Sequence, residues 1–146
     1  MKRRNFIKHL GAGALVLLTP FSSMAAWIEE AFATNDMKKA MTLVNANNPE
    51  ESDLITFKTP EIAENGAIVP ISISTELPNV TSISIFVEKN PTPLTSQFEI
   101  TEDMKPSISV RIRMGETSPV MAVVTSNGKA YKKTNQVKVT IGGCGG

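Results

Sequence analysis

The sequence has one cysteine and one histidine, and aromatic residues make up only 5% of its 146 residues. A single cysteine excludes an internal disulfide framework. One thiol and one histidine cannot complete a tetrahedral metal site within the chain, and there is no haem-attachment motif. We therefore expect no metal and no cofactor bound by this chain itself.

A basic and then apolar segment predicts an export signal over residues 1–25. Four basic residues precede an apolar run at 10–18, and Ser23 and Ala25 are small residues of the kind that signal peptidase reads. The run is too short for a retained anchor, so we expect no membrane anchor in the mature form. Residues 3–8, RRNFIK, resemble the twin-arginine motif and predict periplasmic localisation by that route. A second possible cleavage site follows Ala33.

Removing the signal changes the charge of the chain. Four of the 15 basic residues and the single histidine lie before residue 26, so 11 basic and 14 acidic residues remain, with a net charge of −3. Nucleic acid is therefore not an expected partner, because its binding depends on a basic face.

The segment 26–53 is expected to form a helix and a linker. Apolar residues at Met37, Ala40, Met41 and Val44 have helical spacing, and Asn35 or Asp36 can cap the first turn. The residues at 45–53 are polar and rich in turn formers, and they read as a linker.

From residue 54 the apolar period changes to two, which predicts strands with one buried face. Turn signals separate these runs, and the sharpest is Asn127-Gly128, typical of a two-residue type I′ hairpin. About seven strands over residues 54–141 predict an all-β, immunoglobulin-like antiparallel sandwich without the inter-sheet disulfide. The expected strands lie at 54–57, 69–73, 83–87, 94–100, 108–114, 120–125 and 137–141.

The chain ends in Gly142-Gly143-Cys144-Gly145-Gly146. Glycine has no Cβ and holds no fixed conformation, so residues 142–146 are expected to form a flexible arm that presents the thiol. The arm could enter a narrow pocket of another protein, because its glycines add only backbone. A frayed terminus is the simpler interpretation, but it does not account for the symmetric glycine frame.

Several stretches together resemble the SoxY family, the sulfur carriers of the bacterial thiosulfate-oxidising system. They cover most of the chain from residue 54 and include the terminal motif, and the segment 26–53 shows little similarity. The matching stretches are PEIAENGAIVP at 60–70, FVEKNP at 86–91, RIRM at 111–114 and VKVTIGGCGG at 137–146.

The resemblance implies a carrier rather than an enzyme, with Cys144 as the covalent attachment point of its sulfur cargo. It also implies a heterodimer with SoxZ, a second β-sandwich subunit, and transient contacts with haem-containing SoxXA, with the hydrolase SoxB and in some organisms with SoxCD. Joining a thiol to thiosulfate is a two-electron oxidation. A redox partner is therefore required, and the resemblance implies that the haem of SoxXA accepts the electrons.

Other interpretations remain open from the sequence. Gly145-Gly146 could instead carry sulfur as a C-terminal thiocarboxylate, or Cys144 could form an intermolecular disulfide in a structural module. Arg111 and Arg113 share a strand face and could contact an anion or a partner, although a solvated face is the simpler interpretation. Phe86 is out of phase with its apolar neighbours. It could fill the second sheet, but we expect it at the interface with the partner subunit SoxZ.

Overall fold

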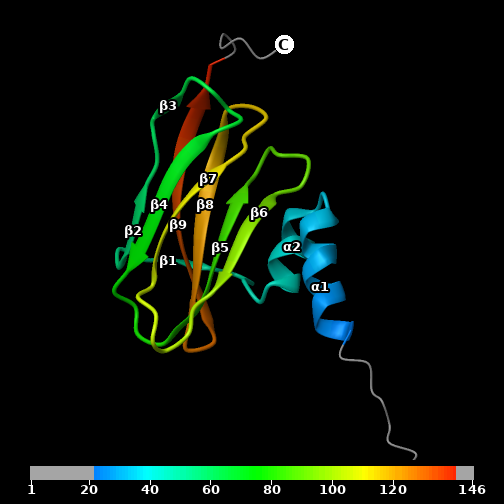
Figure 1. The fold of residues 1–146 in the computed structure, drawn as a ribbon, viewed down its shortest axis with the longest axis vertical. Coiled ribbons are helices and arrows are strands. Elements are labelled where there is room, and N and C mark those ends of the chain that lie inside the picture. Colours follow the sequence, from blue (N-terminus) through cyan, green and yellow to red (C-terminus); the bar gives the residue numbers. More distant parts are fainter. Residues whose placement is uncertain (1–21, 141–146) are drawn as a thin grey trace, which may run out of the picture.

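The computed structural model describes residues 22–140, and the side chains of residues 28–140. Residues 22–43 contribute two helices, and two β-sheets then pack face to face (Figure 1). The helices are α1 (Ser22–Ala33) and α2 (Met37–Leu43), and the strands are β1 (Glu50–Glu51), β2 (Ile55–Lys58), β3 (Ile62–Ala63), β4 (Val69–Thr75), β5 (Val80–Val87), β6 (Leu94–Glu99), β7 (Ser107–Ile112), β8 (Ser118–Ser126) and β9 (Lys129–Val139).

The larger sheet has the strand order β1-β9-β8-β5-β6, with β3 also paired to β9, and the smaller sheet has the order β2-β4-β7. Most neighbours are antiparallel, but β1 and β3 pair with β9 in parallel. The expected two-sheet, immunoglobulin-like sandwich is confirmed. The last strand is longer than expected and begins at Lys129. The sequence pattern did not reveal its first half, because those residues are mostly polar and show no apolar alternation.

The main core lies between the sheets and is built from the alternating apolar residues of the strands. Ile83, Ile85 and Val87 of β5 are completely buried, and they meet Ile71 and Ile73 of β4 in one cluster. Their intervening neighbours point outward, as the period of two requires. Because β5 lies within the larger sheet rather than at its edge, its apolar side chains are enclosed on all sides.

A second, smaller core lies on the outer face of the larger sheet, beneath the two helices. Ala31 of α1 and Ala40 of α2 are fully buried there against Phe86 and Leu94. Figure 1 shows the helices beside β6 on that side of the sandwich. The expectation that Phe86 lies at a partner interface is wrong, because this chain's own helices cover the ring.

Helix α2 begins where the sequence indicates. The side chain of Asp36 accepts hydrogen bonds from the backbone N–H groups of Lys38 and Lys39 at 2.9 and 3.2 Å, which caps the first turn. Helix α1 was not expected, because its residues surround the two possible cleavage sites. No helix among the described residues is long and apolar enough to cross a membrane.

The segment 45–53 is packed against the sandwich. Ala46 is buried, and Glu50 and Glu51 pair with β9. The Lys133 ammonium lies 2.9 Å from the Asp53 carboxylate, and this hydrogen bond and charge lower the pKa of Asp53 and raise that of Lys133. This segment is therefore attached along β9 rather than free of it. The domain limits at residues 25, 53 and 141 stay predictions.

The hairpin that joins β8 to β9 has the predicted geometry. Ser126 pairs with Lys129, and the two residues between them have positive φ angles, 49° at Asn127 and 76° at Gly128. Both central residues of a type I′ turn require this backbone region.

Truncating Phe86 to alanine is expected to lower the free energy of unfolding by about 3–5 kcal/mol, because it empties the small core under the helices. Urea denaturation followed by circular dichroism measures the change. Met104→Ala is the control, since Met104 is 50% exposed and its truncation should cost less than about 0.5 kcal/mol. An effect of Phe86→Ala no larger than that of the control would contradict the burial of this ring.

Candidate functional site

Strand β9 carries the chain to the start of the expected arm, and its end is held on both sides. On one side, the backbone N–H of Lys138 donates to the Glu61 carbonyl at 3.0 Å, and that of Thr140 donates to the Ala63 carbonyl at 3.1 Å. These bonds extend the pairing between β3 and β9. The backbone is therefore ordered by hydrogen bonds as far as Thr140.

On the other side, Thr117 holds the same strand end through its side chain. The Val139 N–H donates to the Thr117 hydroxyl oxygen at 2.9 Å, and the hydroxyl lies 3.4 Å from the Val139 carbonyl oxygen. One side chain thus contacts both backbone polar groups of the last β9 residue. We call Thr117, together with the β3 contacts, the clamp of the β9 end.

The loop that follows β3 packs tightly onto the same end of the sandwich. The Met114 N–H donates to the Gly66 carbonyl at 2.7 Å, and a Cβ at Gly66 would lie only 2.4 Å from the Met114 carbonyl oxygen. Only glycine permits this approach. The close contact joins the loop before β4 to the loop between β7 and β8.

Asn90 braces that β7–β8 loop from the turn between β5 and β6. Its amide nitrogen donates to the Arg113 carbonyl at 2.7 Å, and its amide oxygen accepts from the Gly115 N–H at 3.0 Å. A single side chain therefore fixes the backbone on both sides of Met114. The sequence did not reveal Asn90 or Thr117 as positioning residues, because their partners lie more than twenty residues away along the chain.

The two arginines lie next to this braced loop. Arg111 is the outward residue near the end of β7, Arg113 follows the strand, and both are exposed. Among the described residues, no carboxylate oxygen lies within 4.0 Å of either guanidinium group. Arg111 and Arg113 are therefore brought together, as their spacing indicates, and no ion pair with a described carboxylate neutralises them.

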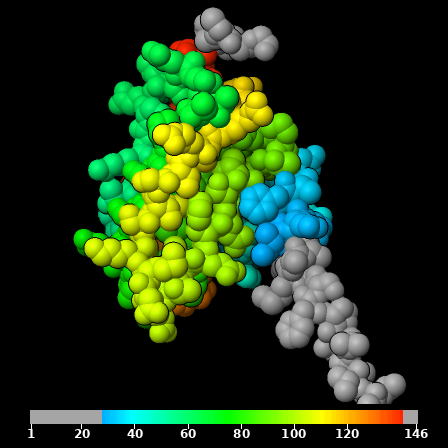
Figure 2. All heavy atoms as spheres, in the orientation of Figure 1, coloured from blue at the N-terminus to red at the C-terminus, as the bar shows by residue number. Residues whose placement is uncertain are grey.

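Both arginines line a groove of about 570 Å³ between β6 and β7. These strands are the outer members of the two sheets at this side, so the groove runs along the open side of the sandwich. In Figure 2 the segment around β7, in yellow, lies beside the light-green segment of β6, and the blue helices cover the other flank of β6. We call this the β6–β7 groove; its other lining residues include Phe32, Asn90, Thr95 and Ser96.

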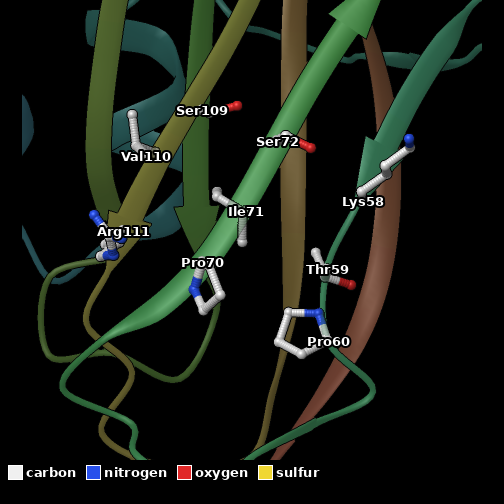
Figure 3. A pocket seen from close by; sticks show the side chains of 9 residues that line it. All are labelled: Lys58, Thr59, Pro60, Pro70, Ile71, Ser72, Ser109, Val110 and Arg111. Carbon is white, nitrogen blue, oxygen red and sulfur yellow. The ribbon is translucent and has the colours of Figure 1, made fainter.

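A second hollow lies on the outer face of the smaller sheet. Figure 3 shows Lys58 and Arg111 on opposite sides of it, with the hydroxyl groups of Ser72 and Ser109 between them. Lys58 pairs across the strands with Ser72, which in turn pairs with Ser109. Arg111 thus borders both hollows.

The residues predicted as the carrier arm, Cys144 with Gly142, Gly143, Gly145 and Gly146, lie outside the described residues. Within residues 28–140, no group of three or more histidine, cysteine, aspartate or glutamate side chains could hold a metal ion. What the structure provides at this end is a clamped strand terminus beside two exposed arginines.

Comparison with known proteins identifies this architecture. The family model described as sulfur oxidation protein SoxY matches residues 39–144. A solved structure described as the sulfur carrier protein SoxY from Chlorobium limicola f thiosulfatophilum is 43% identical, with a TM-score of 0.63 over 70% of this chain and 94% of that chain. No curated protein sequence matches this chain.

A second structural match concerns the fold alone. A superoxide reductase (neelaredoxin) from Ignicoccus hospitalis has a TM-score of 0.53 at 13% identity, over 59% of this chain and 80% of that chain. The same two-sheet sandwich thus occurs at an identity too low to transfer a function.

The molecule is accordingly a small β-sandwich of the immunoglobulin-like class, with a helical cover on one face. It belongs to the SoxY family of sulfur oxidation proteins. The resemblance found from residue 54 onward is confirmed, and the family match begins earlier than the sequence alone indicated, at residue 39.

Replacing Thr117 with valine is expected to loosen the β9 end, because the Val139 N–H loses its side-chain acceptor. A hydrogen bond of this type contributes about 0.5–1.5 kcal/mol, so amide exchange at Val139 should accelerate by roughly three- to tenfold. Hydrogen exchange followed by NMR measures this. Thr117→Ser retains the hydroxyl and is the control; equal exchange in both variants would show that the hydroxyl does not hold the strand.

Proposed function

We propose that Cys144 is the covalent attachment point for thiosulfate-derived sulfur, which the protein presents to the enzymes of thiosulfate oxidation. The observation that carries this proposal is the family match itself, which extends as far as residue 144. The clamp of the β9 end supports it, because a segment that begins at a fixed point keeps its thiol within a limited distance of the sandwich.

The protein is a sulfur carrier and not an enzyme. A carrier needs one nucleophile and access to it, and Cys144 is the single thiol of the chain. Forming Cys–S–S–SO₃⁻ from a thiol and thiosulfate releases two electrons and a proton. The electrons pass to a redox enzyme, for which we propose a haem protein of the SoxXA type.

The remaining partners follow from membership in this family. We propose a SoxZ-like sandwich subunit as the stable partner, and enzymes of the SoxB and SoxCD types as transient ones. The basic, twin-arginine-like start of the sequence supports export to the periplasm. Such a route carries folded cargo, which suits a protein that leaves the cytoplasm together with a subunit lacking its own signal.

Cys144→Ser is expected to abolish the sulfur adduct completely. Intact-mass spectrometry of the protein from the periplasm of thiosulfate-fed cells, before and after a reductant, measures the loss. The native protein should show a reductant-labile adduct on its last tryptic peptide. An adduct that persists in Cys144→Ser would indicate the Gly146 carboxylate, and a bare disulfide dimer in the native protein would indicate a structural module.

The mature chain is expected to begin at Ala26. Cleavage after Ala33 would remove the whole of α1. The loss would include Ala31, which is fully buried against the sheet, and Glu30, whose carboxylate lies 2.5 Å from the Lys39 ammonium. The outer face around Phe86 would then lose part of its cover. N-terminal sequencing of the periplasmic protein should give Ala-Trp-Ile, and a chain that begins at Thr34 would contradict this assignment.

A further inference from the structure

The β6–β7 groove carries a positive charge that no described acidic side chain neutralises. Arg111 and Arg113 are its charged lining residues, no carboxylate belongs to the lining, and no described carboxylate pairs with either. The mature chain as a whole is acidic, with 14 acidic and 11 basic residues after residue 25. Two arginines that no described carboxylate neutralises, in one groove of an acidic protein, favour an anionic occupant, because guanidinium groups bind oxyanions in a bidentate manner.

The groove also offers hydrogen-bond donors suited to such an anion. Thr92, Thr95 and Ser96 contribute hydroxyl groups from the β6 side, although the Thr95 hydroxyl already donates to the Ile85 carbonyl at 3.1 Å. Phe32 and Leu94 supply an apolar wall. A short chain that ends in a sulfonate would place its charge at the arginines and its backbone along this wall.

The C-terminal segment begins close to the groove. Asn90 and Gly115 line the groove, and Gly115 is two residues from Thr117, which contacts Val139. Two residues span at most about 7 Å. Cys144 is four residues beyond Thr140, a reach of about 14 Å, and the terminal carboxylate is two residues further.

We propose that the β6–β7 groove receives this chain's own C-terminal segment, residues 141–146, when Cys144 carries an anionic sulfur group. Arg111 and Arg113 bind the terminal sulfonate of the adduct, and the arm leaves the groove when an enzyme takes the cargo. A tethered group has an effective concentration in the millimolar range, so binding of only millimolar strength keeps the arm in the groove about half of the time. The proposal rests on Cys144 as the attachment point.

The adduct can be made without any partner enzyme. The Cys144 thiolate attacks a central sulfur of tetrathionate, a new S–S bond forms, and the central S–S bond of tetrathionate breaks with thiosulfate as the leaving group. The products are protein–S–S–SO₃⁻ and S₂O₃²⁻, and tetrathionate is the oxidant. The probe is the chain from Ala26 to Gly146, with its sandwich partner where the two co-purify.

Loading ¹⁵N-labelled protein in this way is expected to shift the backbone amides of Asn90, Thr95 and Gly115 in NMR spectra. The shifts should vanish in Arg111→Gln/Arg113→Gln and weaken at high ionic strength, because the contact is between exposed charges. Reduction of the adduct by dithiothreitol should become at least about twofold faster in that variant. The control is Lys105→Gln/Lys129→Gln, which removes the same charge from two exposed residues outside the groove.

The outcomes separate the two proposals. No adduct on Cys144 would overturn the carrier function proposed for this thiol. An adduct that leaves the groove amides unshifted, or equal reduction rates in both double variants, would overturn the groove proposal alone. Groove amides that respond to the sandwich partner but not to loading would show an interface between subunits, and this would also overturn it.

Discussion

The structure depends on the way β9 is fixed along its length. One edge of the strand pairs with β8 from the Asn127-Gly128 hairpin to Val137, and its other edge pairs with β1 near its start and β3 near its end. Asn135 also donates to the Phe57 carbonyl at 3.0 Å, which ties β9 to β2 of the smaller sheet. Because a strand held at so many points cannot twist independently, the position of Thr140 is set by the whole sandwich.

The two sides of the sandwich differ in whether side-chain contacts close the space between the sheets. On the β2–β9 side, the Asn135 contacts close the space between the sheets. On the β6–β7 side, no further strand of residues 22–140 follows, and the helices pack on the outer face of the larger sheet beside β6. The groove with Arg111 and Arg113 is therefore a consequence of the topology, and its charge is a property of two side chains alone.

Local patterns predicted most of the strands, because a period of two is a property of neighbouring residues. Val110 and Ile112 point inward and Arg111 outward, as their alternation requires. The outward orientation of Phe86 also followed from its position in the alternating pattern of β5. The pattern did not reveal that the helices cover its ring, because the residues of α1 were assigned to the cleavage region. Thr117 and Asn90 could not be found in this way, because their partners are 22 and 23 residues away.

Under the proposed attachment of sulfur at Cys144, the clamp of the β9 end limits how an enzyme can reach the cargo. With the backbone fixed at Thr140, four residues can carry the Cα of Cys144 at most about 14 Å from the Cα of Thr140. An enzyme with a recessed active site must therefore bring its surface against this end of the sandwich before the thiol can enter. If Cys144 carries the sulfur, as we propose, recognition of the β3, β7–β8 and β5–β6 loops would be coupled to access to the sulfur, and a carrier could in this way select the enzymes that process its cargo.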